Sequence, residues 1–126
     1  MPLSTAVRQR CRAFLRPDEE LRYLFPATSL TVGRGVFGVA NFIVAISDKR
    51  VTVLACSWFR RNKPTSVWAS YPRTMRLGPV DISLAPTLTI GTLVLEIDEQ
   101  YLAVVNAADA EVGDGDVLPP DPLPEL

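Results

Sequence analysis

Histidine is absent from this chain of 126 residues, and cysteine occurs only twice. The absence of histidine removes the commonest general base and metal ligand, so neither a Ser-His-Asp triad nor a Cys-His pair can form within this chain. Cys11 and Cys56 are too few and too far apart in sequence for a structural zinc site or for the disulfide framework of a small secreted domain. We therefore expect two reduced thiols, no bound metal, no cofactor and no enzymatic activity.

Long apolar runs are also missing from the sequence. No stretch reaches the roughly 18–20 apolar residues that a membrane-spanning helix needs. The N-terminal region carries four arginines where a signal peptide would have its apolar segment. The composition, 48% hydrophobic and 21% charged, predicts one globular domain. We expect a cytoplasmic protein, with peripheral attachment to a membrane as an alternative.

Basic residues are absent from the last third of the chain. Residues 1–76 hold all 13 bases and four acids, a formal charge of +9, whereas residues 77–126 hold ten acids and no base, a formal charge of −10. Such an asymmetry indicates an anionic partner or an interaction tail, and it concerns association rather than fold. The acidic segment works against nucleic-acid binding, which we therefore do not favour.

The two ends of the chain differ in predicted structure. Residues 3–16 predict an amphipathic helix with one apolar face. Its arginines suit an exposed face of a helix packed on the rest of the fold, and the alternatives are a membrane-surface helix or a dimer contact. Residues 106–111 predict a short helix, and the acidic, proline-rich residues 112–126 predict a disordered tail. The arginines are Arg8, Arg10, Arg12 and Arg16.

Between these ends the periodicity is that of strands, which are rich in Val, Ile, Thr and aromatic residues. Many short strands separated by turn residues predict an antiparallel barrel or sandwich. The predicted strands are residues 23–32, 41–47, 50–59, 66–71, 75–84, 87–98 (bent at Gly91) and 100–105.

Several short motifs carry a resemblance to a known family. They are Leu15-x-Pro-x-Glu-x-Leu, Val44-Ala-Ile-Ser-Asp-Lys-Arg-Val-x-Val-Leu, Lys63-Pro-x-x-Val, Pro72-Arg and Leu77-Gly-Pro. Over about residues 12–110 the chain resembles bacterial PH-like domains, in particular small uncharacterised actinobacterial proteins of that type.

This resemblance implies a mainly β fold, a small PH-like antiparallel barrel of about seven strands that is strongly bent and plugged at one end by a helix. The helix predicted at residues 106–111 is too short for that plug, and the N-terminal helix is the alternative. The expected organisation is therefore an N-terminal helix over residues 1–16, a barrel over residues 17–111 and a tail over residues 112–126.

One turn groups aromatic and basic residues, in the run Trp58-Phe59-Arg60-Arg61-Asn62-Lys63. In the implied barrel the loop after the first strand lies at the same end and adds Arg34. Aromatic rings beside cations suit a membrane surface or a nucleic acid strand. The alternative is a solvated turn with one aromatic ring in the core. The candidate binding residues are Arg34, Trp58, Phe59, Arg60, Arg61 and Lys63.

We expect a non-catalytic binding or scaffold module that recognises a protein segment or an anionic surface through these residues. The first alternative is peripheral binding to anionic lipids through the same basic and aromatic loop. A small-ligand carrier or an enzyme that uses the barrel interior is a weaker alternative. A protein is the favoured partner, an anionic membrane is the second, and a homo-oligomer through the N-terminal helix is a further prediction.

Overall fold

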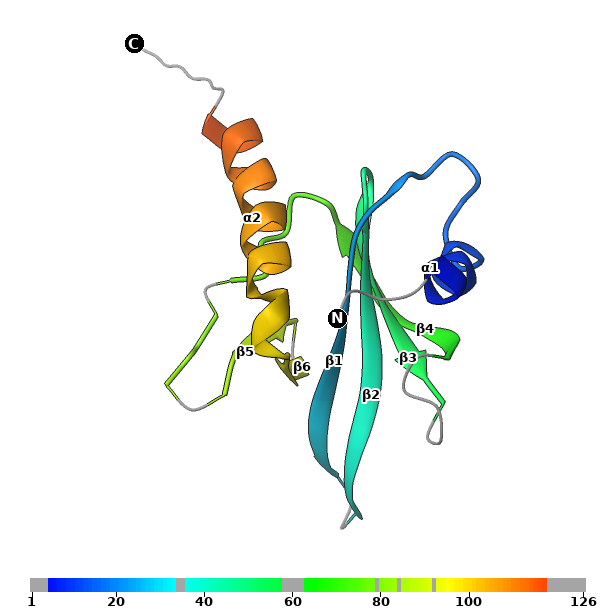
Figure 1. Ribbon diagram of the computed structural model, residues 1–126, viewed down its shortest axis with the longest axis vertical. Coiled ribbons are helices and arrows are strands. Elements are labelled where there is room, and N and C mark those ends of the chain that lie inside the picture. Colours follow the sequence, from blue (N-terminus) through cyan, green and yellow to red (C-terminus); the bar gives the residue numbers. More distant parts are fainter. Residues whose placement is uncertain are drawn as a thin grey trace.

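The computed structural model describes residues 5–33, 36–57, 63–78, 80–83, 85–91 and 93–117, and it describes residues 30–33, 36–39 and 113–117 by their backbone only. Its main feature is one six-stranded sheet with a helix on either side (Figure 1). The elements are α1 (Thr5–Arg12), β1 (Leu21–Gly33), β2 (Val36–Ser47), β3 (Arg50–Cys56), β4 (Pro64–Pro72), β5 (Thr87–Ile90), β6 (Leu93–Glu96), the 3-10 helix η1 (Glu99–Tyr101) and α2 (Leu102–Val117).

The sheet is antiparallel throughout its named pairs, and its strand order is β4-β3-β2-β1-β6-β5. It curls into a half-barrel, with β4 and β5 as its two edges (Figure 1). The prediction of a mainly β, antiparallel fold is confirmed. The described residues hold six strands in this sheet, and the expected seven are not found among them.

The larger core lies between the sheet and α2. Strand side chains alternate between the two faces of a sheet, so every second residue of each strand points to this core. On the helical side Tyr101, Val105 and Ala108 recur at intervals of four and three residues, which places them on one face. The sheet contributes Phe25, Ala27, Phe42, Val44, Ile46, Val51, Val53, Leu88, Ile90, Leu95 and Ile97.

The smaller core lies on the opposite face of the sheet, under α1. Val7 and Cys11 of α1 are buried against Leu24, Ile43 and Leu54 from the first three strands. A helix is therefore present within the predicted residues 3–16, but it ends at Arg12, residues 13–16 are not helical, and it covers the outer face of the half-barrel. The expectation that this helix plugs the barrel is wrong, because α2 already packs against the inner face (Figure 1).

Helix α2 corrects two further expectations. It spans 16 residues, so the helix predicted at residues 106–111 is longer in both directions, and residues 112–117 of the expected disordered tail are helical. Residues 100–105, predicted as a strand, form η1 and the start of α2. Asp98 begins this helical segment because its side chain accepts a hydrogen bond from the Gln100 N–H at 3.0 Å. Apolar runs this short do not distinguish a buried strand from a buried helix.

The predicted strand at residues 75–84 is also wrong. Its backbone bonds elsewhere: the N–H groups of Leu77 and Gly78 donate to the Asp109 carboxylate of α2 at 2.8 and 2.7 Å. Asp81 alone forms an isolated bridge, with Thr87 at the start of β5. A strand cannot form where a helix side chain has taken the donors that a ladder would use.

The predicted bend at Gly91 is a complete turn between two strands, β5 and β6. Gly91 has a φ of 61°, a left-handed conformation that residues with a Cβ rarely adopt. A Cβ at this position would also meet the Tyr71 ring of β4. This close approach brings the β5–β6 turn against Tyr71 of the edge strand β4.

Candidate binding surface

Most of the predicted binding residues lie outside the described part of the chain. These are Arg34, Trp58, Phe59, Arg60 and Arg61. The sixth, Lys63, is exposed immediately before β4, and its carbonyl oxygen accepts a hydrogen bond from the Ser57 N–H at 2.9 Å. This bond closes the base of the β3–β4 loop, so the loop begins and ends at neighbouring points of the sheet.

The topology brings the two loops that carry these residues to one end of the sheet. Strands β1 and β3 are both antiparallel to β2, so they run in the same direction. The loops that follow them, at residues 34–35 and 57–63, therefore leave the sheet at its same end, which we call the loop end (Figure 1).

The two loops do not start at the same level. The last pair between β2 and β3 is Phe42 with Ala55, whereas the β1–β2 pairing continues for six more pairs, as far as Gly33 with Val36. At about 3.3 Å per residue the β1–β2 hairpin projects roughly 20 Å beyond that last pair. The loop end is therefore a projecting two-stranded hairpin with the base of a second loop beside it.

The opposite end of the sheet is held by a buried carboxylate. The Glu19 side chain is only 1% exposed and accepts hydrogen bonds from the Arg16 N–H at 3.0 Å, from the Arg50 Nε–H at 2.9 Å and from the Ser47 hydroxyl. Burial by itself would raise the pKa of Glu19, but these hydrogen bonds and the Arg50 charge outweigh it and lower the pKa. Glu19 is therefore an ionised structural anchor at neutral pH.

Further bonds join the same two segments. The Glu20 N–H donates to the Asp48 carboxylate at 2.9 Å, and the Asp48 N–H donates to the Glu20 carbonyl oxygen at 3.0 Å. Lys49 pairs with Asp18 at 2.7 Å. These contacts link the motif around Glu19 to the motif around Ser47 and Arg50, and we call the whole arrangement the Glu19 clamp. No pattern within either motif indicates that the two segments meet.

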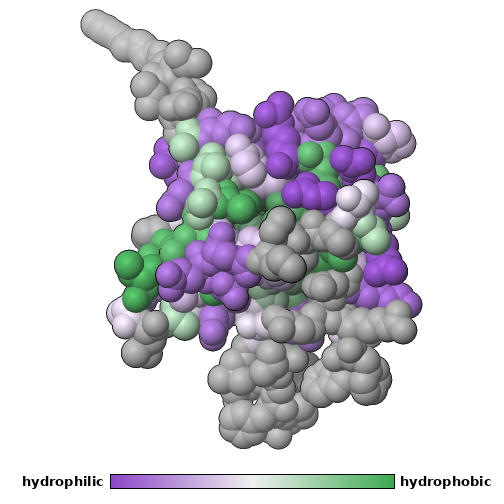
Figure 2. Space-filling view, in the orientation of Figure 1, coloured by the Kyte–Doolittle hydropathy of each residue, from purple (hydrophilic) through white to green (hydrophobic). Residues whose placement is uncertain are grey.

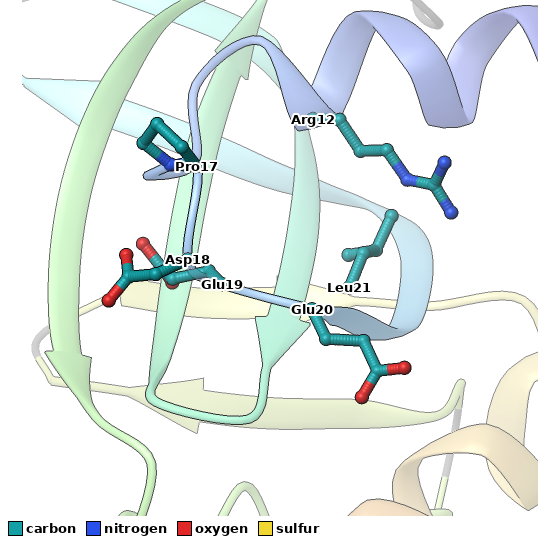
Figure 3. Close-up of a pocket in the computed structure, with 6 residues that line it drawn as sticks. All are labelled: Arg12, Pro17, Asp18, Glu19, Glu20 and Leu21. Carbon is teal, nitrogen blue, oxygen red and sulfur yellow. The ribbon is translucent and has the colours of Figure 1, made fainter.

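A shallow depression of about 410 Å³ lies beside this clamp (Figure 3). Its charged groups point away from one another, with the Arg12 guanidinium on one side and the Asp18 and Glu20 carboxylates on others. Asp18 and Glu19 are already engaged in the clamp. The depression therefore offers no converging set of free polar groups of the kind that fixes a small ligand. It is lined by Arg12, Pro17, Asp18, Glu19, Glu20 and Leu21.

The arginines of the N-terminal segment lie on the outside of the molecule. Arg10, Arg12 and Arg16 are exposed and Arg8 is half-buried, and no ion pair with another described residue is formed by any of the four. This agrees with an exposed face of a packed helix. Hydrophilic residues also cover much of the described surface seen in Figure 2.

Helix α2 is tied to the sheet by an acidic residue that the sequence did not single out. Glu111 accepts a hydrogen bond from the Tyr23 hydroxyl at 2.8 Å and pairs with Arg73 at 3.2 Å and with Arg22 at 3.6 Å. The hydrogen bond from Tyr23, the Arg22 charge and the contacts with Arg73 lower the pKa of Glu111 against a smaller opposing effect of burial. Arg22 and Arg73 thus both pair with one carboxylate from the acidic part of the chain.

The two cysteines are free thiols on the α1 side of the sheet. Burial raises the pKa of Cys11 to about 11 and that of Cys56 to about 12. Both thiols are therefore protonated at neutral pH, and the thiolate is the form that acts as a nucleophile. Cys11 is buried in the smaller core between α1 and the sheet, and Cys56 packs against that core.

In the described residues no group of three or more Cys, Asp or Glu side chains could hold a metal ion. No helix within the described ranges is long and apolar enough to cross a membrane. No protein-family model matches the chain, and no significant match is found among curated proteins or among solved structures.

Proposed function

We propose that this protein is a non-catalytic binding module whose loop end, with Arg34, Trp58, Phe59, Arg60, Arg61 and Lys63, recognises an anionic surface. The observation that carries the proposal is the parallel direction of β1 and β3, which sends both candidate loops to one end of the sheet. The shared chemistry of the partner is negative charge, on an acidic protein segment or on lipid headgroups.

The distribution of acids supports this choice of surface. No Asp or Glu occurs in residues 21–47 or 49–80, which include both loops and all of β1 to β4. The acids nearest in sequence, Asp18, Glu19, Glu20 and Asp48, lie at the opposite end, where the Glu19 clamp engages them. Positive charge at the loop end therefore has no acidic neighbour in these strands to neutralise it.

A PH-like identity is part of the same proposal. It is supported by a curled antiparallel sheet whose inner face is filled by α2, since the resemblance implies a bent barrel plugged by a helix. The isolated bridge between Asp81 and Thr87 lies beside the edge strand β5, where a seventh strand would add to the sheet.

A charge-removal experiment tests the loop end. Replacing Arg60, Arg61 and Lys63 by Ala is expected to weaken binding to phosphatidylserine vesicles and to poly-glutamate by roughly a hundredfold, since each cation near an anionic surface contributes about 1 kcal/mol. Replacing Arg8, Arg10 and Arg12 by Ala removes the same charge from α1 and is the matched control. Vesicle sedimentation and fluorescence titration at about 0.15 M salt measure the two affinities.

The outcomes separate the candidate partners. Loss of vesicle binding alone identifies lipid headgroups, and loss of poly-glutamate binding alone identifies an acidic protein segment. Equal losses in the loop variant and the α1 control would mean that only net charge matters, and the proposed surface would be wrong.

A further inference from the structure

The edge strand β4 presents an uncharged surface. None of its nine residues is charged, and six of them are exposed. Edge strands usually carry charges, because an uncharged edge invites another chain. Two prolines and a bulge at Trp68, where the register with β3 shifts, limit how far a new backbone ladder could extend along β4. A contact here would therefore depend on side chains. The exposed residues are Thr65, Ser66, Val67, Trp68, Ser70 and Pro72.

Trp68 is the most prominent side chain of this strand. It is 60% exposed, yet its ring is held by an edge-to-face contact with the buried Phe42, with ring centroids 5.5 Å apart and an interplanar angle of 73°. Val67 beside it is 48% exposed. A fixed, exposed tryptophan costs little conformational entropy on binding, and tryptophan is the residue type most often found as an interface anchor.

The N-terminal helix is less suited to hold two copies together. Its apolar residues Val7 and Cys11 are already buried against the sheet of their own chain. Its outer side carries Arg8, Arg10 and Arg12, so two copies of α1 would bring like charges together.

We propose that a second copy of this chain packs against β4 around a two-fold axis close to Trp68. In a two-fold contact each patch meets a copy of itself, so a charged patch would meet its own sign, whereas the uncharged β4 carries no such penalty. The depletion of charge and the presence of tryptophan are also features of interface centres. The contact uses a different surface from the loop end, so it goes beyond the proposed function and is independent of it.

Sedimentation equilibrium of the full chain tests the proposal. The wild type is expected to dimerise, and Trp68→Ala is expected to weaken the dimer by at least about 30-fold, as for an interface anchor. Ile82→Ala is the matched control, because Ile82 is 68% exposed but lies outside β4, and it should leave the dissociation constant unchanged. Circular dichroism establishes that each variant is folded.

A charge pair at Val67 tests the symmetry itself. Val67→Arg and Val67→Glu should each be monomeric, because each places like charges on both sides of the axis, and a mixture of the two should form a heterodimer. A wild type that stays monomeric up to about 1 mM overturns the proposal. So would a dimer that Ile82→Ala weakens as strongly as Trp68→Ala, or single-charge variants that dimerise as the wild type does. If Trp68→Ala left self-association unchanged and weakened only the binding of a different protein, β4 would be the site for that protein and the proposal would be wrong.

Discussion

At the scale of single residues, Glu19 shows how one buried carboxylate organises distant parts of the chain. Its oxygens accept hydrogen bonds from the segment before β1 and from the turn between β2 and β3. A buried charge is tolerated only when it is paired and hydrogen-bonded, and both conditions hold here. The stability of this end of the sheet therefore depends on the ionisation of Glu19.

The lowered pKa of Glu19 predicts a loss of stability in acid. The ionised form is favoured in the folded state, so the stabilisation is complete above the ordinary value of 4.5 and is lost as the pH falls through the lower folded value. Glu19→Gln should reduce the free energy of unfolding at pH 7 by about 2 kcal/mol, because Arg50 loses its partner. The difference between wild type and variant should shrink toward pH 3.

Urea denaturation at a series of pH values measures this difference. Glu20→Gln is the control, since Glu20 is exposed and the one ion pair that it forms with a described residue, Arg22, is long at 3.7 Å. A constant difference between the wild type and Glu19→Gln from pH 7 to pH 3 would contradict an electrostatic role for Glu19.

At the scale of elements, α2 is the part whose placement decides the interior of the half-barrel. Tyr101, Val105 and Ala108 bury one side of the helix, and Glu111 ties it to β1 and Arg73. Asp109 accepts two hydrogen bonds from the irregular segment between β4 and β5. The helix therefore holds in place a stretch that has no ladder of its own.

Asp109→Ala is expected to loosen that stretch. It leaves the N–H groups of Leu77 and Gly78 without their acceptor in a partly buried position, which should cost about 2 kcal/mol. Hydrogen exchange at these two amides should accelerate more than exchange in β2. Asp109→Asn keeps one acceptor oxygen and should have an intermediate effect. Unchanged exchange at Leu77 in Asp109→Ala would show that the hydrogen bonds do not hold the segment.

At the scale of the whole molecule, the charge asymmetry of the sequence becomes a spatial arrangement. Some of the bases are neutralised within the fold, by Glu111 and in the Glu19 clamp. Arg8, Arg10, Arg12 and Arg16 form no ion pair with the described residues, and Lys63 is exposed next to the loop end. Among the described residues, positive charge without an ion pair therefore lies on α1, at Arg16 just after it, and at Lys63 beside the loop end.

The acidic C-terminal segment is expected to compete for this positive charge. Val112 is buried, so a deletion that tests the tail must begin after Val117 and remove residues 118–126, with Asp121 and Glu125. We expect the truncated chain to bind phosphatidylserine vesicles more tightly than the full chain at low salt, and equally at high salt. A variant with Asp121→Asn and Glu125→Gln should behave like the truncation. Equal binding at low salt would show that the segment does not compete.

Much of the fold follows from local patterns in the sequence. The strand-like periodicity predicts β2 and β3, although the strand predicted at residues 41–47 lacks the first five residues of β2. The errors lie where long-range contacts decide the outcome. The Leu77 N–H donates a hydrogen bond to Asp109, 32 residues further along the chain. Residues 100–105 are helical and contribute Tyr101 and Val105 to the core that covers the sheet. The resemblance implied that the two binding loops leave the sheet at one end, and the directions of β1 and β3 agree with this. Five of the six candidate residues themselves lie outside the described part of the chain.

The sequence by itself determined the antiparallel β character of the strands β1 to β4, the packed N-terminal helix and the separation of basic from acidic residues. These properties depend on neighbours close in the chain or on composition alone. Only the tertiary structure decided that α2 and not α1 fills the half-barrel, that Glu19 is an anchor, and that β4 is an uncharged edge. These depend on which apolar faces and buried charges meet across the sheet, and burial is a property of the assembled fold.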